Sequence, residues 1–158
     1  MRASYSFRPI REEDGELLFA IYAATRADEM ALLDWSERQK QDFLRMQFSA
    51  QHQHYQAVFP DGRFDLILVD GEPVGRLYVH QTDEELRIVD IALLPQHRRK
   101  GLGGAILQEL LEHARNAAKP VRIHVERNNP ALHLYQRLGF TRISETGIYL
   151  LMEKPPTS

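Results

Sequence analysis

The chain has 158 residues, of which 43% are apolar and 27% are charged. This composition is typical of one compact globular domain and excludes a chain that is disordered throughout. The formal net charge is -2 at pH 7, so the overall charge gives no reason to expect nucleic acid as a partner.

The sequence contains no cysteine, which excludes thiol catalysis, cysteine-bound zinc and disulfides. A domain of this length buries roughly 70% of its unfolded surface and needs no structural metal. No apolar run approaches the ~20 residues that cross a bilayer, and Met1–Ile10 lacks the apolar core of a signal peptide. We therefore expect a cytoplasmic protein with no metal and with neither membrane nor nucleic acid as a partner.

The first half of the sequence predicts a strand, two helices and an antiparallel run of three strands. The second helix begins at Asp34 or Ser36, because Ser36 and Gln39 have the spacing of a capping box. The change from helical to alternating periodicity after this helix, with the turn signal Asp70-Gly71, predicts the strands. The expected ranges are residues 4–9, helices 11–24 and 36–57, and strands 64–69, 74–79 and 86–94.

The second half predicts a helix over 102–118, a strand over 121–126 and a short helix over 130–138. A closing hairpin follows, with strands 140–143 and 148–152 around Gly147, and residues 155–158 form a disordered tail. We find no repeat and no linker, so residues 1–154 are expected to form a single α/β (α+β) domain. Its sheet is mostly antiparallel, flanked by helices, and becomes parallel where strand, helix and strand follow one another.

The most informative segment lies between a predicted strand and a helix. Gly101, Gly103 and Gly104 allow backbone N–H groups to approach a ligand, and the helix N-terminus adds a positive dipole. These features favour a phosphate site, with added charge from three basic residues, Arg98, Arg99 and Lys100. The alternative is a glycine-rich turn that only starts a helix. No Gly-Lys-Ser/Thr follows, so the segment is not a nucleotide P-loop.

A second motif follows about 30 residues later. Asn129, Pro130 and Ala131 come after a predicted strand, Leu134 and Tyr135 lie on a short helix, and that helix stops at Gly139 and Phe140. Together with Arg98, Gly101 and Gly103 as Arg-x-x-Gly-x-Gly, this pattern resembles the GNAT superfamily of N-acetyltransferases. The two motifs cover about residues 86–140, and the order of elements over nearly the whole chain agrees with that fold.

The resemblance implies a binding site for acetyl-CoA. In this family two strands splay apart and admit the pantetheine arm, which here would meet the backbone of Leu93 and Leu94 and the side chain of Asn129. The pyrophosphate would bind the N–H groups of residues 99–104, where Leu102 joins the three glycines, with Arg98 or Lys100 adding charge.

The resemblance also implies catalytic roles. Tyr135 matches the family tyrosine whose hydroxyl protonates the departing thiolate of coenzyme A, although a core aromatic is the alternative. His124 stands where some members have a carboxylate and is suited to take a proton near neutral pH, or is a structural histidine. Glu126 shares a strand face with His124 and is a further candidate. Another family position for the base is Arg87 here, and Asp90 is better explained by a structural bond to backbone or an arginine.

With no cysteine available, we expect direct attack of a primary amine on acetyl-CoA in a ternary complex. The acceptor is an unidentified small molecule, peptide or protein, and longer acyl groups and a homodimer stay open. The alternative function is a non-catalytic acyl-CoA-binding sensor or interaction module. Polar and aromatic candidates for the acceptor region are Glu29, Trp35, His54, Tyr55, Arg76, Tyr78 and His80.

Overall fold

The computed structural model describes residues 4–156, and the predictions for residues 1–3, 157 and 158 lie outside that range. The chain divides into two compact units. The first unit comprises the chain up to Tyr78 together with Asp90–Arg98. The second comprises Val79–Val89 and the chain from Arg99 onward. Strands β3 (Glu72–Gln81) and β4 (Leu86–Leu93) contribute to both units.

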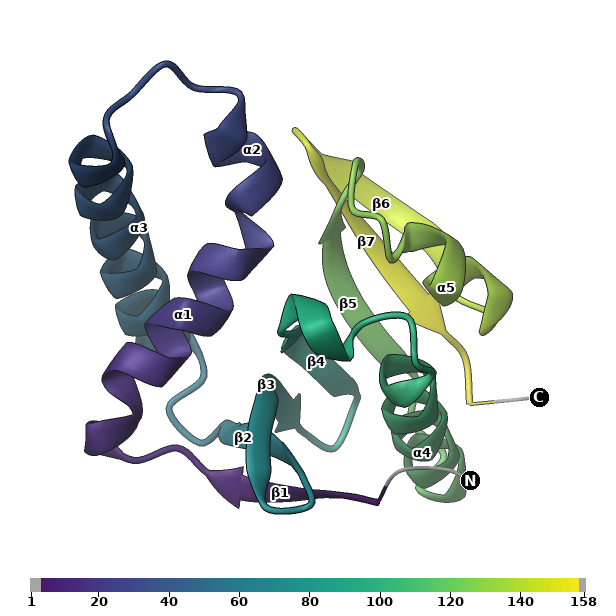
Figure 1. The fold of residues 1–158 in the computed structure, drawn as a ribbon. Helices are drawn as coiled ribbons and strands as arrows, with labels where there is room; N and C mark the ends of the chain where they lie inside the picture. Colours follow the sequence, from purple (N-terminus) through teal and green to yellow (C-terminus); the bar gives the residue numbers. More distant parts are fainter. Residues whose placement is uncertain (1–3, 157–158) are drawn as a thin grey trace. The chain divides into compact units, whose positions relative to one another are not determined.

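The first unit combines three helices with the N-terminal strands (Figure 1). Strand β1 pairs antiparallel with β2, with Tyr5 opposite Val69 and Pro9 opposite Asp65. Besides its parts of β3 and β4, this unit contains β1 (Tyr5–Pro9), a 3-10 turn η1 (Glu12–Asp14), α1 (Gly15–Thr25), α2 (Ala27–Ala31), α3 (Glu37–Val58), β2 (Arg63–Val69) and a second 3-10 turn η2 (Pro95–His97).

The predicted first helix is broken into shorter pieces. A 3-10 turn precedes α1, and the Asp14 carboxylate accepts the N–H of Arg11 at 2.7 Å and forms an ion pair with Arg8 at 3.0 Å. The short helix α2, which the periodicity did not predict, follows one residue after α1. It spans five residues, too few for a helical hydrophobic period to be recognised.

Helix α3 begins where the sequence predicted. The Ser36 hydroxyl accepts the N–H of Gln39 at 3.1 Å, and the Gln39 side chain accepts the N–H of Ser36 at 2.8 Å. This reciprocal pair is a capping box, which satisfies two backbone donors at the helix start. The prediction of a capping box at Ser36 is therefore confirmed.

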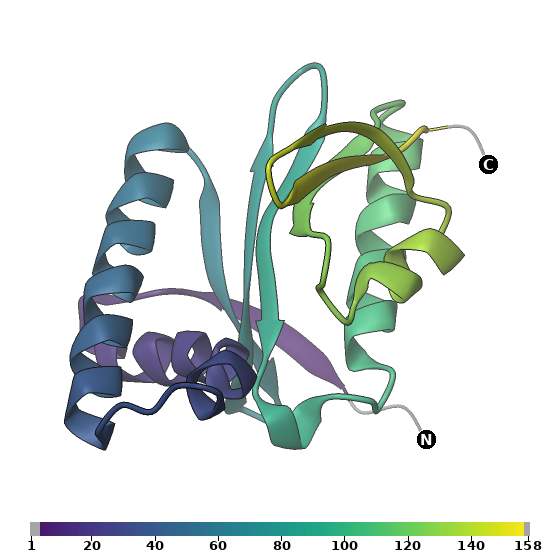
Figure 2. The same ribbon diagram turned by 90° about the horizontal axis from the view of Figure 1, so that it is seen from above.

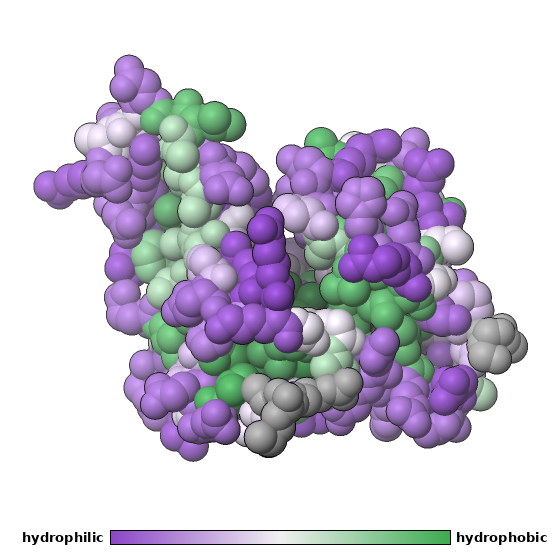
Figure 3. All heavy atoms as spheres, turned by 45° about the vertical axis from the view of Figure 1, so that its right-hand side comes forward, coloured by the Kyte–Doolittle hydropathy of each residue, from purple (hydrophilic) through white to green (hydrophobic). Residues whose placement is uncertain are grey.

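Two groups of apolar side chains form the core of the first unit. One joins α1 to β2 and β4 through Leu18, Ile21, Leu66 and Ala92. The other joins the three helices through Phe19, Tyr22, Met30 and Leu44. Not all apolar residues are covered: Figure 3 shows hydrophobic side chains exposed at the upper end of the helical part, where α2 is joined to α3. Leu32, in this connection, is 87% exposed.

The second unit packs α4 beside β5, as Figures 1 and 2 both show. Strand β5 pairs antiparallel with β7, and β7 pairs antiparallel with β6. The register of the second pair shifts between Arg142 and Ser144, which indicates a bulge. The elements are α4 (Leu102–Asn116), β5 (Val121–Glu126), α5 (Leu132–Arg137), β6 (Thr141–Thr146) and β7 (Tyr149–Lys154).

The strands pair in the order β1-β2-β3-β4-β5-β7-β6. The pair β4 and β5 is parallel, whereas β1 with β2, β5 with β7 and β6 with β7 are antiparallel. The parallel pairing joins Leu86–Ile88 to Val121–Ile123, although β4 and β5 each continue beyond these residues. The predicted α/β class with a mostly antiparallel sheet is thus confirmed.

Candidate functional site

The start of α4 has the backbone geometry of an anion site. Gly101 is its N-cap residue at φ 81°, and no side chain caps the helix. The preceding loop also holds Arg99 at φ 62°, a left-handed conformation uncommon for a residue with a Cβ. The first N–H groups of an α-helix have no acceptor within the helix. The N–H groups of Leu102, Gly103 and Gly104 are therefore positioned to bind an anion together with the helix dipole.

The backbone just before this loop already has partners inside the first unit. The Arg98 Nε donates to the carbonyl of Leu93 at 2.9 Å. The Leu94 N–H donates to the carbonyl of Val74 at 2.8 Å, and the Leu94 carbonyl accepts the N–H of His97 at 2.9 Å. A carbonyl oxygen has two lone pairs, so neither of these hydrogen bonds by itself prevents a further contact at Leu93 or Leu94. Arg98 has a role in fixing the loop that the sequence did not reveal.

Tyr135 lies on α5 and is only 3% exposed. Its ring meets the edge of Phe140 at a centroid distance of 5.8 Å, and its carbonyl accepts the N–H of Phe140 at 3.0 Å. Gly139, at φ 100°, turns the chain between them. The Asn129 side-chain oxygen accepts the N–H of Ala131 at 2.8 Å, which stabilises the turn that leads into α5. Asn129 thus supports the element that carries Tyr135.

His124 lies on the polar face of β5. Along this strand Val121, Ile123 and Val125 are buried, whereas His124 is exposed and Glu126 is half-buried. Successive side chains of a strand point to opposite faces, so His124 and Glu126 share one face, as predicted.

An arginine from β4 contacts this histidine directly. The Arg87 Nη1 lies 3.0 Å from the His124 Nδ1. Arg87 also pairs with Glu85, with Nε 2.8 Å from Oε2. The loss of hydration lowers the pKa of His124 below its usual 6.5, the charge of Arg87 lowers it further, and Glu85 acts in the opposite direction. His124 is therefore neutral at pH 7.

Asp90 belongs to a separate polar cluster in the first unit. Its carboxylate accepts hydrogen bonds from the Arg76 Nη2 at 2.8 Å and from the Tyr55 hydroxyl at 3.0 Å. Arg76, which is 2% exposed, also donates to Gln51 at 2.9 Å. The structural bond from Asp90 to an arginine is thus confirmed. The cluster joins α3, β3 and β4, which is the kind of long-range contact that sequence spacing does not show.

Three further acceptor candidates, Glu29, Trp35 and Tyr78, differ in their surroundings. Glu29 pairs with Arg26 at 3.0 Å on the surface of α2. The Trp35 ring meets the edge of Phe43 at 5.4 Å. Tyr78 is 1% exposed, and burial raises the pKa of its hydroxyl.

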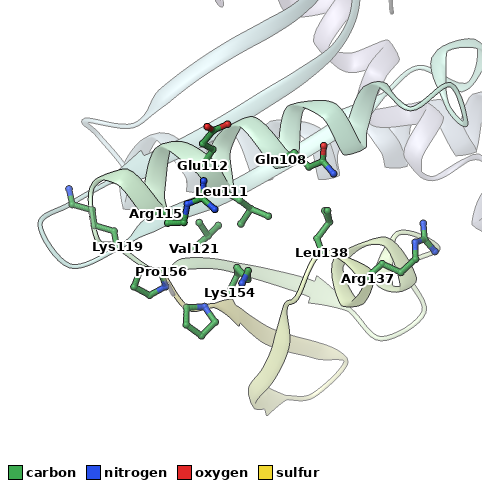
Figure 4. Close-up of a pocket in the computed structure, with 11 residues that line it drawn as sticks. Gln108, Leu111, Glu112, Arg115, Lys119, Val121, Arg137, Leu138, Lys154 and Pro156 are labelled. Atoms are coloured by element: carbon green, nitrogen blue, oxygen red, sulfur yellow. The ribbon is translucent and has the colours of Figure 1, made fainter. Parts of the chain in front are cut away.

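One open cavity lies in the second unit. It has a volume of about 480 Å³ and is bounded by α4, β5, the last residues of α5 and β7 and the residues that follow these two elements (Figure 4). Its lining residues are Gln108, Leu111, Glu112, Arg115, Lys119, Val121, Arg137, Leu138, Lys154, Pro155 and Pro156. None of the residues predicted to bind coenzyme A or to act in catalysis lines it.

Residues 4–156 contain neither a metal-binding cluster nor a membrane-spanning helix. No group of three or more His, Asp or Glu side chains there is arranged to hold a metal ion. None of the helices in that range combines the length and the apolarity that a membrane span needs.

Curated relatives match only part of the chain. An N-alpha-acetyltransferase of Sulfurisphaera tokodaii is 36% identical over 59 residues, which are 35% of this chain and 35% of that protein. A mycothiol acetyltransferase of Thermobifida fusca is 37% identical over 89 residues, 55% of this chain and 23% of that protein. A protein of Bacillus subtilis, named UPF0157 protein YqkA, is 32% identical over 73 residues, 46% of this chain and 21% of that protein. The matched regions thus span about a fifth to a third of these relatives.

Solved structures share the fold over nearly the whole chain. The PaiA N-acetyltransferase of Thermoplasma acidophilum, solved in complex with coenzyme A, has a TM-score of 0.70 at 20% identity and covers 96% of this chain and 99% of its own. An acetyltransferase of Thermus thermophilus has a TM-score of 0.69 at 20% identity, over 96% of this chain and 97% of its own. The model of the Acetyltransferase (GNAT) family matches residues 27–140, more than half of the sequence. This chain belongs to the GNAT acetyltransferase family.

Proposed function

We propose that this protein is an N-acetyltransferase that moves the acetyl group of acetyl-CoA to a primary amine of a small molecule, peptide or protein. The observation that carries the proposal is the uncapped start of α4, where Gly101 at φ 81° leaves the first N–H groups open beside Arg99 and Lys100. Such a helix start binds the pyrophosphate of the cofactor. The carbonyls of Leu93 and Leu94 and the side chain of Asn129 are proposed to meet its arm.

The proposed reaction is a direct transfer within a ternary complex. The nitrogen lone pair of the neutral amine attacks the thioester carbonyl carbon and forms the new C–N bond, and the C–S bond then breaks. The Tyr135 hydroxyl gives its proton to the departing sulfur. The amine proton passes to a side chain on the polar face of β5, His124 or Glu126, and returns to Tyr135 when the products leave. The products are an amide and coenzyme A with a free thiol.

The acceptor is proposed only as a class. The matched relatives are named for different acceptors, among them an N-alpha-acetyltransferase, mycothiol acetyltransferases and a streptothricin acetyltransferase of Streptomyces lavendulae. Their likeness supports acetyl transfer and does not single out one amine. A non-catalytic acyl-CoA sensor is the competing proposal, because the Arg87 contact at 3.0 Å occupies one ring nitrogen of His124.

The test measures binding and turnover together. Calorimetry is expected to show acetyl-CoA binding, and thiol release with a panel of amines and peptides is expected to show turnover. Cofactor binding without turnover on any acceptor favours the sensor, and no binding at all contradicts both proposals. Competition among acyl-CoA chain lengths then identifies the group that is transferred.

Tyr135→Phe tests the proposed acid. We expect kcat to fall by about 10- to 1000-fold with little change in acetyl-CoA affinity, because only the proton donor is lost. Phe140→Leu serves as a control for packing, since Phe140 is the aromatic neighbour of Tyr135. An unchanged kcat in Tyr135→Phe removes the hydroxyl from the mechanism.

A further inference from the structure

The contact between Arg87 and His124 has only one chemically allowed direction. A guanidinium carries N–H donors and has no acceptor, so Arg87 must donate and the His124 Nδ1 must accept. A nitrogen that accepts a hydrogen bond carries no proton. The neutral imidazole therefore has its single proton on Nε2. Protonation of Nδ1 would break the 3.0 Å bond and place two positive charges side by side.

The arginine is itself held in place by one carboxylate, Glu85. The two carboxylate oxygens of Glu85 each accept a hydrogen bond from Arg87, Oε2 from Nε at 2.8 Å and Oε1 from Nη2 at 3.2 Å. Glu85 also accepts from the Arg122 Nη1 at 3.1 Å, and the Arg122 Nε donates to Glu153 at 2.7 Å. Arg87 and Arg122 lower the pKa of Glu85 against the effect of its burial, so this carboxylate stays charged at neutral pH.

This network of arginine and glutamate side chains extends across three neighbouring strands. Arg87 and Arg122 are direct register partners on β4 and β5, and Arg122 is opposite Glu153 on β7. The charged groups that act on the imidazole are Arg87 from β4 and Glu85, the residue before β4. The same sheet region also carries Arg122 and Glu126 on β5 and Glu153 on β7. Of these, Arg87 is the one that contacts the ring at hydrogen-bond distance.

We propose that Arg87 is a positioning residue that fixes His124 as the neutral tautomer with its proton on Nε2, so that His124 serves acetyl transfer as a hydrogen-bond donor and not as the proton acceptor. This inference rests on the proposed function. It assigns the acceptance of the amine proton to Glu126, which lies on the same face of β5. The Nε2–H of His124, a residue on the exposed face of β5, then donates to the substrate or to a water bound beside it.

The first experiment observes the tautomer in the protein without substrates. Nitrogen-15 NMR of the histidine ring at pH 7 is expected to show a protonated Nε2 and an unprotonated Nδ1. Arg87→Met removes both charge and donor, so the pKa of His124 is expected to rise towards 6.5 and the tautomers to mix. Arg87→Gln keeps a neutral N–H donor and is expected to retain the tautomer while the pKa rises. A proton on Nδ1 in the unmodified protein, or a pKa that Arg87→Met leaves unchanged, overturns the proposal.

The second experiment separates a donor from a base. A glutamine amide places an N–H near the position of Nε2 but does not take up a proton at neutral pH. We expect His124→Gln to keep at least tenfold more kcat/KM than His124→Ala, and the pH profile of His124→Gln to keep its lower limb. Equal losses in both variants, with that limb abolished, assign the base to His124 and overturn the proposal.

The two experiments also distinguish this inference from the proposed function. Failure of the acetyltransferase proposal appears as no turnover in the unmodified protein, whereas the NMR result is independent of turnover. A loss of solubility in Arg87→Met does not block the test, because Arg87→Gln and the tautomer of the unmodified protein remain to be measured.

Discussion

Helices α3 and α4 begin in opposite ways. At the start of α3, Ser36 and Gln39 exchange hydrogen bonds of 3.1 and 2.8 Å, so the chain satisfies its own backbone donors. At the start of α4, the N-cap residue Gly101 has a left-handed backbone conformation and no side chain, so no side-chain hydrogen bond caps this helix. The same physical need, acceptors for the first N–H groups, is met internally in one helix and left for a ligand in the other.

The comparison separates stability from binding. A capping box stabilises the folded chain, and the backbone N–H groups that it occupies are not available to bind an anion. An uncapped helix start loses that contribution and keeps a site whose dipole and N–H groups favour negative charge. The two helix starts are therefore expected to respond to substitution in different measurements.

The largest effect is expected when the open helix start receives its own negative charge. Gly101→Asp places a carboxylate where the pyrophosphate is proposed to bind, and we expect acetyl-CoA affinity to fall by about 100-fold. Gly101→Asn is the matched control, because Asn and Asp both tolerate φ near 81° and only Asp is charged. Calorimetry of both variants makes the comparison. Equal affinities for Asp and Asn would show that the helix start does not bind the phosphates.

A smaller effect is expected at α3, and it concerns stability and not acetyl-CoA binding. Ser36→Ala removes the side-chain acceptor of the capping box and is expected to lower the free energy of unfolding by about 1 kcal/mol, with acetyl-CoA affinity unchanged. Ser36→Thr retains a capping hydroxyl and is the control. Urea denaturation gives the first quantity and calorimetry the second. A change in affinity without a change in stability would contradict the comparison.

The smallest effect is expected from mild acid. The pKa values of His52 on α3 and His124 on β5 are lowered first by the loss of hydration and then by Arg76 and Arg87, respectively. The unfolded chain therefore binds more protons just below pH 6.5, so stability is full above that pH and declines as pH falls through it.

The carboxylates whose pKa values are lowered do not account for the loss of stability just below pH 6.5. Asp14 and Glu85 have pKa values below their ordinary 3.8 and 4.5, so their contributions are lost only at lower pH. Denaturation at pH 5.2 and 7.5 measures the effect, and the His52→Gln, His124→Gln double variant is expected to show less pH dependence. The same slope in the double variant would assign it to other groups.

Local chemistry explains what the sequence could predict. The capping box at Ser36 and the glycine-rich start of α4 each depend on residues within a few positions of one another, and both are present. The strand predicted over 121–126 has the bounds of β5, in which Val121, Ile123 and Val125 are buried. The first helix was less well predicted, because it begins with a 3-10 turn at which Asp14 pairs with Arg8. The five-residue α2 was missed because it is too short to show a helical period.

The candidate site shows where local reasoning ends. The sequence predicted catalytic roles for Tyr135, His124 and Glu126. It did not predict which side chains they contact. Arg87 and His124 are separated by 37 positions, and Tyr55 and Asp90 by 35. Only the pairing of strands or the packing of a helix on them brings such groups within 3 Å. A sequence pattern therefore indicates the candidate histidine but not Arg87, the arginine proposed to fix its tautomer.

By itself, the sequence determined the α/β class, the two motifs of the family and the uncapped glycine start of α4, because each depends on backbone preferences and short spacings. The tertiary structure alone decided which charges meet. Register placed Arg87 opposite Arg122 with Glu85 between their guanidinium groups, and packing placed Arg76 and Tyr55 on Asp90. Hydrogen bonds act over a few ångströms, so their partners are fixed by the three-dimensional arrangement of strands and helices and not by distance along the chain.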